Sequence, residues 1–265
     1  MSVKATLSFG RSFKIVIGKE YHVSVEGTQE EKDTVTSNVT SDGVIITQKN
    51  KNVASGGSSF NFNNIVGRNG SFSINGSNIS ISGNNVYINN GTISGMAIGK
   101  PSTLDIIVTV PGVVPVTMET NGSYENINLG DVANLVVGVK SSSDVCFSSA
   151  KNATINIQGS GSVIGERAEN AKFSIQGSGN IKVENIIGSI NADIQGSGNI
   201  KVDNGCFSSP KINVMGSGDV KLNGKVTGDI NANVMGSGDI KVTIIGEHVG
   251  NVNKNKMGSG SITIK

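Results

Sequence analysis

Few residues of this 265-residue sequence stand at the spacings that catalysis or metal binding requires. The two histidines, His22 and His248, are far apart in the chain, whereas a metal site or an acid–base pair needs several such groups close together. The two cysteines, Cys146 and Cys206, begin the similar stretches CFSSAK and CFSSPK, and neither has a histidine nearby to activate it. These residues therefore predict no catalytic group, no metal site and no cofactor.

A repeated Gly-Ser-Gly triplet is another candidate for chemistry, because glycine-rich loops can cradle phosphates. A phosphate loop needs G-x-x-x-x-G-K-[ST] at the start of a helix. The nearest stretch, SGMAIGKPST at residues 94–103, has Ser94 and Pro101 at two of the required positions. A calcium-binding repeat needs regularly placed carboxylates, but only Asp219 and Asp239 follow a triplet directly. We expect the triplets to shape the backbone rather than to bind a ligand.

The most suggestive surface feature is a set of four lysines, each three residues after the last glycine of a triplet. If the repeats stack, the ammonium groups form a row about 4.8 Å apart, which is a linear patch for an anionic polymer or a lipid surface. An acidic residue lies two positions from each lysine, which weakens this hypothesis, and a solvated face that keeps the protein soluble is the simpler interpretation. The lysines are Lys182, Lys201, Lys221 and Lys241, and the acidic residues are Glu184, Asp203, Asp219 and Asp239.

The triplet recurs at a period near twenty residues, which is typical of repeat proteins. Successive triplets begin 18, 19, 20, 20 and 22 residues apart. Their flanks mostly alternate apolar and polar residues, as strands with one buried face do. One unit of this length cannot bury its own apolar face, so the units must stack. The triplets occupy residues 159–161, 177–179, 196–198, 216–218, 236–238 and 258–260.

We predict an all-β fold, a right-handed parallel β-helix of about 18–22 residues per coil, because each strand can pair in parallel with its equivalent one coil away. The strict hexapeptide pattern of left-handed β-helices is absent, and parallel crossovers are usually right-handed. Aliphatic residues at equivalent positions should form two inward columns. The first column is Ile181, Ile200, Val220, Ile240 and Ile262, and the second is Val183, Val202, Leu222, Val242 and Ile264.

Three regions differ in their pattern. Residues 1–50 hold alternating segments and the turn Ser41-Asp42-Gly43, which predict an N-terminal antiparallel β meander that caps the coil. Residues 51–100 are rich in Gly, Asn and Ser but keep Ile or Phe at many alternate positions, which fits either irregular coils or an insertion. Residues 101–265 carry the six triplets and form the parallel β-helix.

The composition limits the classes of partner. The 22 Lys and Arg residues are interspersed with 20 Asp and Glu, so no basic run indicates nucleic-acid binding. No stretch approaches 18 consecutive apolar residues, so no transmembrane segment is predicted. No signal peptide is recognisable, which favours a cytoplasmic location. The two cysteines should lie about three coils apart, too far for a disulfide, and free thiols fit a reducing compartment.

Several motifs together carry a resemblance to a known family. GSGNIKV and GSGDIKV, the stretch VTVPGxxxVTMETNGS and the lead-in VSVEG…D…DGVIIT resemble the putative autotransporter-adhesin, head GIN-domain family. The resemblance runs from about Phe13 to Lys265, and residues 52–100 are the least typical. It implies a right-handed parallel β-helix and a location in the cell envelope or outside the cell. The family has no established catalytic residues, so none is carried over.

We expect a non-enzymatic scaffold or adhesion module that presents repeated surface ladders to a partner or to itself. Its partner would be a protein or an anionic polysaccharide surface. A polysaccharide-binding or polysaccharide-degrading enzyme is one alternative, because stacking would bring Asp219 and Asp239 to about 5 Å, near the spacing of a retaining carboxylate pair. A self-assembling filament protein, joined through open coil ends as a homo-oligomer, is the other.

Overall fold

The computed structural model describes residues 2–40, 43–49, 60–61, 73–75, 79–82, 85–88, 92–94 and 102–265. The chain divides into two compact units, one of residues 1–50 with 103–265 and one of residues 51–102. Residues 41–42 of the expected turn and residues 95–101 of the stretch compared with a phosphate loop lie outside the described residues, as does most of the expected region of irregular coils.

The larger unit is a β-solenoid of about 8 turns, and the structure is 67% strand and 2% helix. The predicted fold class is confirmed; the right-handed winding stays a prediction. Its elements are β1 (Ser2–Leu7), β2 (Gly10–Ile17), β3 (His22–Glu26), α1 (Gln29–Lys32), β4 (Val35–Thr40), β5 (Gly43–Gln48), β11 (Asp105–Val110), β12 (Val116–Thr120), β13 (Tyr124–Asn128), β14 (Asp131–Val139), β15 (Val145–Ile157), β16 (Ser162–Ile175), β17 (Asn180–Gly188), β18 (Ile190–Ile194), β19 (Asn199–Phe207), β20 (Lys211–Gly216), β21 (Val220–Val226), β22 (Ile230–Gly236), β23 (Ile240–Ile244), β24 (Val252–Met257) and β25 (Ile262–Ile264).

The smaller unit contains short antiparallel strands. β6 (Phe60–Asn61) and β7 (Ser73–Asn75) both pair with β10 (Thr92–Ser94), and β8 (Ile79–Ser82) pairs with β9 (Asn85–Ile88). Neither sheet carries the parallel pairing of the larger unit. In the described residues, this region of the chain is therefore built differently from the coils.

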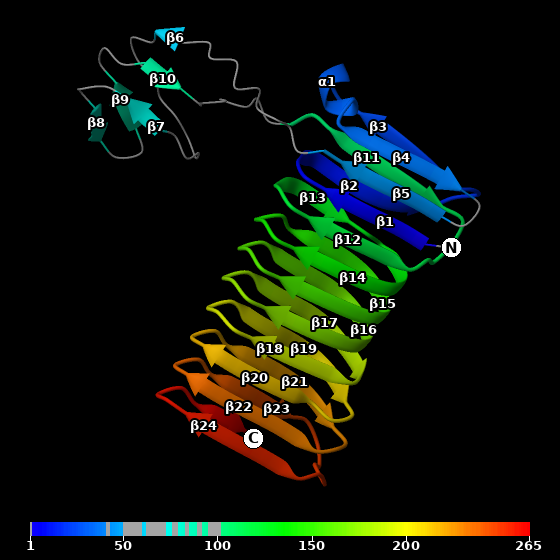
Figure 1. The fold of residues 1–265 in the computed structure, drawn as a ribbon. Helices are drawn as coiled ribbons and strands as arrows, with labels where there is room; N and C mark the ends of the chain where they lie inside the picture. The colour runs from blue at the N-terminus through cyan, green and yellow to red at the C-terminus, as the bar shows by residue number, and fades with distance from the viewer. Residues whose placement is uncertain are drawn as a thin grey trace. The chain divides into compact units, whose positions relative to one another are not determined.

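Two parallel ladders run along the solenoid, one on each side of the Gly-Ser-Gly corners (Figure 1). Strands that enter the corners pair in the order β5, β1, β12, β14, β15, β16, β18, β20, β22 and β24, which we call the first ladder. Strands that leave the corners pair in the order β11, β2, β13, β15, β16, β17, β19, β21, β23 and β25, which we call the second ladder.

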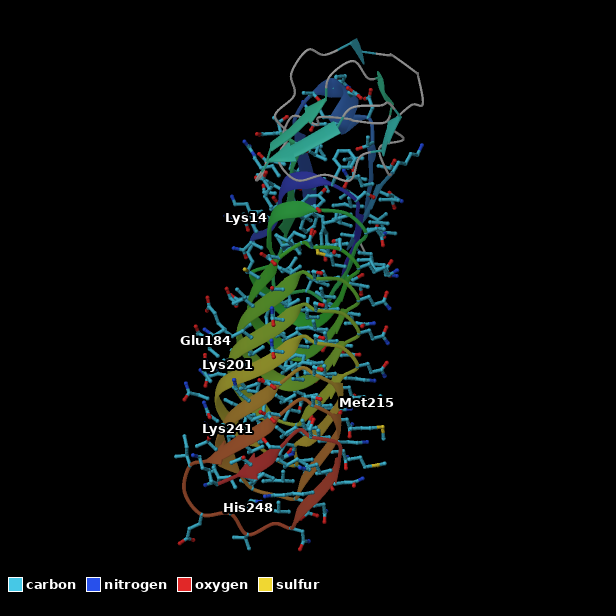
Figure 2. All side chains as sticks on the ribbon, turned by 90° about the vertical axis from the view of Figure 1, so that its left-hand side faces the viewer. Lys14, Glu184, Lys201, Met215, Lys241 and His248 are labelled. Carbon is cyan, nitrogen blue, oxygen red and sulfur yellow. The ribbon has the colours of Figure 1, made fainter. Side chains whose placement is uncertain are left out.

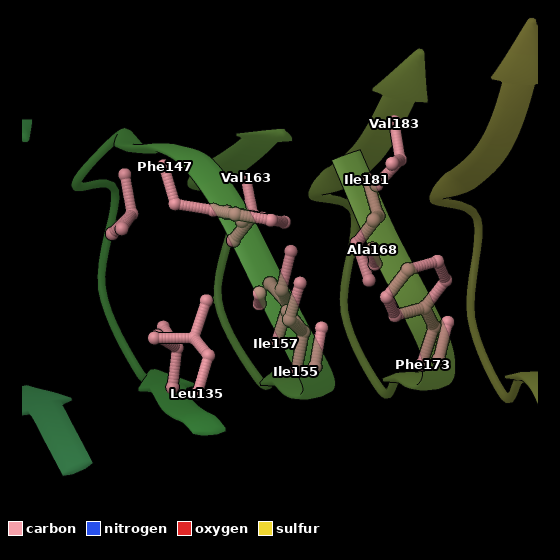
Figure 3. Packing of buried hydrophobic residues seen from close by; sticks show 14 of the residues in the cluster. Leu135, Phe147, Ile155, Ile157, Val163, Ala168, Phe173, Ile181 and Val183 are labelled. Atoms are coloured by element: carbon pink, nitrogen blue, oxygen red, sulfur yellow. The ribbon is translucent and has the colours of Figure 1, made fainter. Parts of the chain in front are cut away.

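Both predicted inward columns are confirmed by the register of the second ladder. Ile181 opposes Ile200 and Val183 opposes Val202, and the pairing continues in step through the last coil. Their side chains are at most 1% exposed up to Ile240 and Val242. Figure 3 shows Ile181 and Val183 with Leu135, Ile155 and Phe173 of the first ladder, all directed into the coil. The core is an aliphatic column filled from both ladders.

Two of the buried aromatic rings, Phe147 and Tyr124, fit where the neighbouring coil has a glycine. Phe147 opposes Gly165 in the register, and a Cβ on that glycine would lie 2.2 Å from the ring. The Phe147 ring therefore fills the space that a side chain at position 165 would need. The composition already showed few aromatics, and the structure explains how these two are accommodated.

Close stacking explains the glycines of the corners. A Cβ on Gly198 would lie 2.0 Å from the backbone oxygen of Gly179 in the preceding coil, and a Cβ on Gly179 would lie 2.1 Å from that of Gly161. Real Cβ atoms do not approach backbone oxygens so closely. These glycines do not have left-handed backbone angles, whereas Gly236, with φ of 134°, does. The first glycine of each of the last three triplets has positive φ, so these corners need glycine for its backbone angle as well as for space.

The N-terminal strands enter the stack in its interior. β1 pairs in parallel with both β5 and β12, and β2 pairs in parallel with both β11 and β13. The coil formed by β1 and β2 is therefore inserted between coils formed by later segments of the chain. Antiparallel pairing in the described residues 2–40 and 43–49 is limited to β4 with β5 and to β3 with β11. Residues 49–104, most of which lie outside the described residues, join β5 to β11.

Polar side chains hold the strand that follows this long connection. Arg11 and Ser12 of β2 both donate hydrogen bonds to the carboxylate of Asp105 at the start of β11, at 2.9 Å from Arg11 Nε and 2.7 Å from Ser12 Oγ. The hydrogen bond from Arg11 keeps the pKa of Asp105 below its usual range, although burial opposes this. Next to it, the buried Glu31 carboxylate accepts hydrogen bonds from the backbone and hydroxyl of Thr103.

The glycine stacking makes a quantitative prediction. Gly198→Ala should lower the free energy of unfolding by about 1–3 kcal/mol, because the new methyl group forces two coils apart. Gly112→Ala is the matched control, since a Cβ there has no neighbour within 4 Å. Urea unfolding followed by circular dichroism measures both. Equal stability of the two variants would contradict steric stacking as the role of the corner glycines.

The Asp105 carboxylate predicts a dependence of stability on pH. Its pKa is lower in the folded protein than in the unfolded chain, so the ion pair stabilises above the unfolded pKa of about 4 and is lost as the pH falls through the folded value. Asp105→Asn should therefore be less stable than the parent at pH 7, and the difference should close below about pH 4. Unfolding midpoints in urea at a series of pH values provide the measurement. If the stability difference between the parent and Asp105→Asn stays unchanged in acid, the stabilising role of the Asp105 carboxylate is refuted.

Candidate interaction surface

Four lysines lie in register on the outer side of the second ladder, as the sequence predicts. Lys182 opposes Lys201, Lys201 opposes Lys221, and Lys221 opposes Lys241. We call these four residues the lysine ladder. Figure 2 shows Lys201 and Lys241 on one side of the solenoid, with Glu184 near them. They alternate with buried neighbours such as Ile181 and Val183, so the strand pleat directs every lysine outward.

The lysine ladder is bounded at both ends by uncharged residues. In the preceding coil the equivalent position is Ile164, which is 47% exposed, and in the following coil it is Thr263. Further up the solenoid the column continues through Cys146 and Asn128 to Lys14. The positive charge at this position is therefore concentrated on four consecutive coils.

Carboxylates partly neutralise the lysine ladder. Asp203 lies between two of its members, with 2.5 Å from its Oδ1 to Lys201 Nζ and 3.4 Å from its Oδ2 to Lys182 Nζ. The hydrogen bond from Lys201, followed by the charges of both lysines, lowers the pKa of Asp203. Asp219 Oδ2 lies 3.8 Å from Lys221 Nζ. Within the described part of the chain, Lys241 has no carboxylate at ion-pair distance.

These ion pairs are exposed and easily exchanged. The lysine side chains are 47%, 49% and 53% exposed at Lys182, Lys201 and Lys221. Exposed ion pairs contribute only about 0–1 kcal/mol, since water and salt screen them and ordering two side chains costs entropy. A polyanion can therefore replace the internal carboxylates at little cost. The arrangement suits salt-sensitive binding of an anionic surface.

The outer side of the first ladder carries a groove that the sequence analysis did not single out. It has a volume of about 580 Å³ and crosses β18, β20, β22 and β24. Along it, Asp193, Asn213, Asn233 and Asn255 lie in register. Asn213 donates to Asp193 at 2.5 Å, and Asn233 donates to Asn213 at 2.8 Å. The repeated flanks ADIQ, INVM, ANVM and KNKM contain this signal, because their second letter is the outward residue.

The acidic residues that follow the triplets serve as links between coils. Asp219 Oδ1 accepts the backbone N–H of Asp239 at 3.0 Å, and Asp239 Oδ1 accepts both the N–H and the hydroxyl of Ser261 at 2.8 Å. The hydrogen bonds from Ser261 lower the pKa of Asp239. A general acid needs a raised pKa, so Asp239 does not fit that role. Both carboxylates bond the backbone of the next coil.

The histidines and cysteines are not brought together. His22 is exposed at the start of β3, and His248 Nε2 lies 2.9 Å from the carbonyl oxygen of Gly228. The register places Cys146 and Cys206 three coils apart, and the two occupy different positions of the repeat. The stretches CFSSAK and CFSSPK are therefore similar in sequence but not equivalent in the coil. Burial, and then Asp144, raises the pKa of Cys146, which disfavours its thiolate.

The described residues hold no group of three or more His, Cys, Asp or Glu side chains placed to bind a metal ion. They also contain no helix that is long and apolar enough to cross a membrane. The features that remain in these residues are extended surfaces that repeat once per coil.

The stacked coils, with columns of like side chains, define the protein as a parallel β-solenoid with a laddered surface. The chain belongs to the family described as "putative auto-transporter adhesin, head GIN domain", whose profile matches residues 5–247. The resemblance stated from the sequence is confirmed. No curated protein matches the chain.

Solved structures with low sequence identity share the fold. A putative lipid binding protein from Parabacteroides distasonis matches with a TM-score of 0.63 at 18% identity, over 99% of this chain and 92% of that one. A putative adhesin from the same species matches with a TM-score of 0.54 at 15% identity, over the same shares. A putative adhesin from Parabacteroides merdae matches with a TM-score of 0.54 at 13% identity, over 100% of this chain and 91% of that one.

Removing the carboxylate within the lysine ladder tests whether it restrains binding. Asp203→Asn should raise the affinity for a polyanion several-fold at low salt, because Lys182 and Lys201 lose their shared internal partner. The gain should disappear at high salt, where exposed charges are screened. Glu169→Gln, which removes one exposed charge outside the ladder, is the control. Titration calorimetry with a polyuronate at several salt concentrations gives both values, and an equal gain in the control would contradict the local effect.

Proposed function

We propose that this protein is a non-enzymatic interaction module that presents ladders of identical side chains, one per coil, to an elongated partner. The observation that carries the proposal is the register of Lys182, Lys201, Lys221 and Lys241 on four consecutive coils. The partner that fits is an anionic polysaccharide. Family membership supports an adhesion role, because the family's description is that of an adhesin.

The rigidity of the solenoid supports this mechanism. The strand spacing of about 4.8 Å places the first and last lysines of the ladder about 14 Å apart along the axis. The buried columns beneath them hold the backbone in place, so a chain with regularly spaced carboxylates or sulfates meets the lysines without ordering the protein first. Each contact is weak, and several contacts on one polymer act together.

An anionic lipid surface also offers negatively charged groups that the lysine ladder could bind. The lipid-binding description of one structural neighbour makes this source worth a separate arm of the test. Four ammonium groups in a straight row fit a linear polymer better than a plane of mobile headgroups. The interspersed carboxylates Asp203, Asp219 and Asp239 would also lie against a negatively charged membrane.

The other two readings of the sequence have less support. An enzyme would need Asp219 and Asp239 free to act as a pair, and both are engaged in links between coils. Stacking of a second copy on β24 would bring it against Lys254 and Lys256, which oppose the buried Ala232 and Val234. Inward charges of this kind block edge-to-edge association. Homo-oligomer formation through coil ends stays a prediction, and it would have to use other edges.

Replacing all four ladder lysines by glutamine tests the proposal. The quadruple variant should lose at least tenfold in affinity for a polyuronate or a sulfated glycan in low salt, because the row of ammonium groups is gone. The control variant has glutamine in place of four other exposed lysines, so it loses the same charge from other surfaces. These lysines are Lys151, Lys172, Lys211 and Lys225. Anionic vesicles and a neutral dextran form the remaining arms. Equal losses in both variants would show general charge attraction and overturn the ladder as the site, and binding to vesicles alone would overturn the polysaccharide.

A further inference from the structure

Three methionines form a column on the surface of the last coils. Met215 opposes Met235, and Met235 opposes Met257. Their exposed fractions are 47%, 53% and 58%, and all three line the groove on the first ladder. Figure 2 shows Met215 pointing away from the coil on the side opposite the labelled lysines. We call these residues the methionine column.

The repeat itself shows that packing does not require methionine here. The residue directly before the triplet is glutamine in the first three triplet corners, at Gln158, Gln176 and Gln195, and methionine in the last three. Glutamine has a similar length and a polar end, so it suits an exposed position better. The protein has only six methionines, and Met118 is 1% exposed, as is usual for this residue. The change from an amide to a thioether on three successive coils therefore indicates that the sulfur atoms have a role.

We propose that the methionine column binds a soft monovalent metal ion, Cu(I) or its analogue Ag(I). Thioethers are soft ligands, and they select Cu(I) over the hard divalent cations. Zinc–sulfur bonds are about 2.3 Å long, and two bonds of similar length from one soft ion would make a linear sulfur–metal–sulfur unit about 4.6 Å long. Adjacent strands are about 4.8 Å apart, so two stacked methionines can hold one ion between them with little movement. Methionine has three rotatable bonds, which lets a third sulfur approach the same ion.

The rest of the groove is compatible with a cation of this class. Its lining contains one charged side chain, Asp193, and no histidine or cysteine. The amide groups of Asn213 and Asn233 are engaged in the hydrogen-bonded row beside the methionines. The groove therefore offers a divalent cation few free hard ligands, whereas the three thioethers are exposed and face the same space. This site is separate from the lysine ladder, and it does not depend on the proposed function.

Calorimetric titration with silver nitrate in a chloride-free buffer tests the proposal. Cys146→Ser and Cys206→Ser form the background, because free thiols bind the same ions; both positions lie in outward columns that accept polar residues. This protein should bind Ag(I), and replacing the methionine column by glutamine should weaken binding at least tenfold. Met235→Gln alone should weaken it more than Met215→Gln, since the middle sulfur serves both neighbours. Met118→Leu should leave binding unchanged.

A second triple variant separates a metal site from an apolar contact surface. Replacing the methionine column by leucine keeps the apolar surface but removes the sulfur, so it should lose Ag(I) binding as the glutamine variant does. Circular dichroism and urea midpoints check that both variants fold, and the glutamine variant reproduces what earlier coils already carry. Retention of Ag(I) binding by either folded triple variant, or absence of binding in the parent, would overturn the proposal.

Discussion

The structure depends on how closely one coil can lie on the next. At the Gly-Ser-Gly corners a Cβ on the glycine would fall 2.0–2.4 Å from a backbone oxygen of the preceding coil, so only glycine permits the stacking. With the corners aligned, parallel strands on both sides pair in register over many coils. Every other column follows from this alignment, because the strand pleat sends alternate residues into the core and outward.

The register turns a short repeat into long surfaces. Where successive coils keep one residue type at the same position, as with lysine on the second ladder, the side chains form a row with the spacing of the strands. A residue type that changes, such as glutamine to methionine before the triplet, divides one row into two chemically different segments. Carboxylates use the same geometry when Asp219 and Asp239 bond the backbone of the next coil. A ladder can therefore reinforce the stack or remain available to a partner.

The first coils of the solenoid differ from the later ones in strand order and in the contacts at their corners. Its first strand is held between strands formed by later segments, so the coil of β1 and β2 is complete only when β5, β11 and β12 have joined it. The corner between β1 and β2 has no triplet, and the Gln48 side chain at the end of β5 bonds to it. Its Oε1 accepts hydrogen bonds from the backbone of Ser8 and the hydroxyl of Tyr124. This buried polar network is specific to one coil, in contrast to the repeated backbone contacts of the later corners.

The sequence by itself determined the repeat, the parallel β-solenoid, both inward columns and the lysine ladder, because a period near twenty with alternating flanks leaves few other ways to bury the apolar face. Only the tertiary structure decided where residues outside that period lie. The insertion of β1 and β2 between later coils, the use of Asp203 by two lysines and the non-equivalence of Cys146 and Cys206 depend on contacts between coils. Such contacts join residues that no local pattern relates, so they become visible only when the coils are stacked.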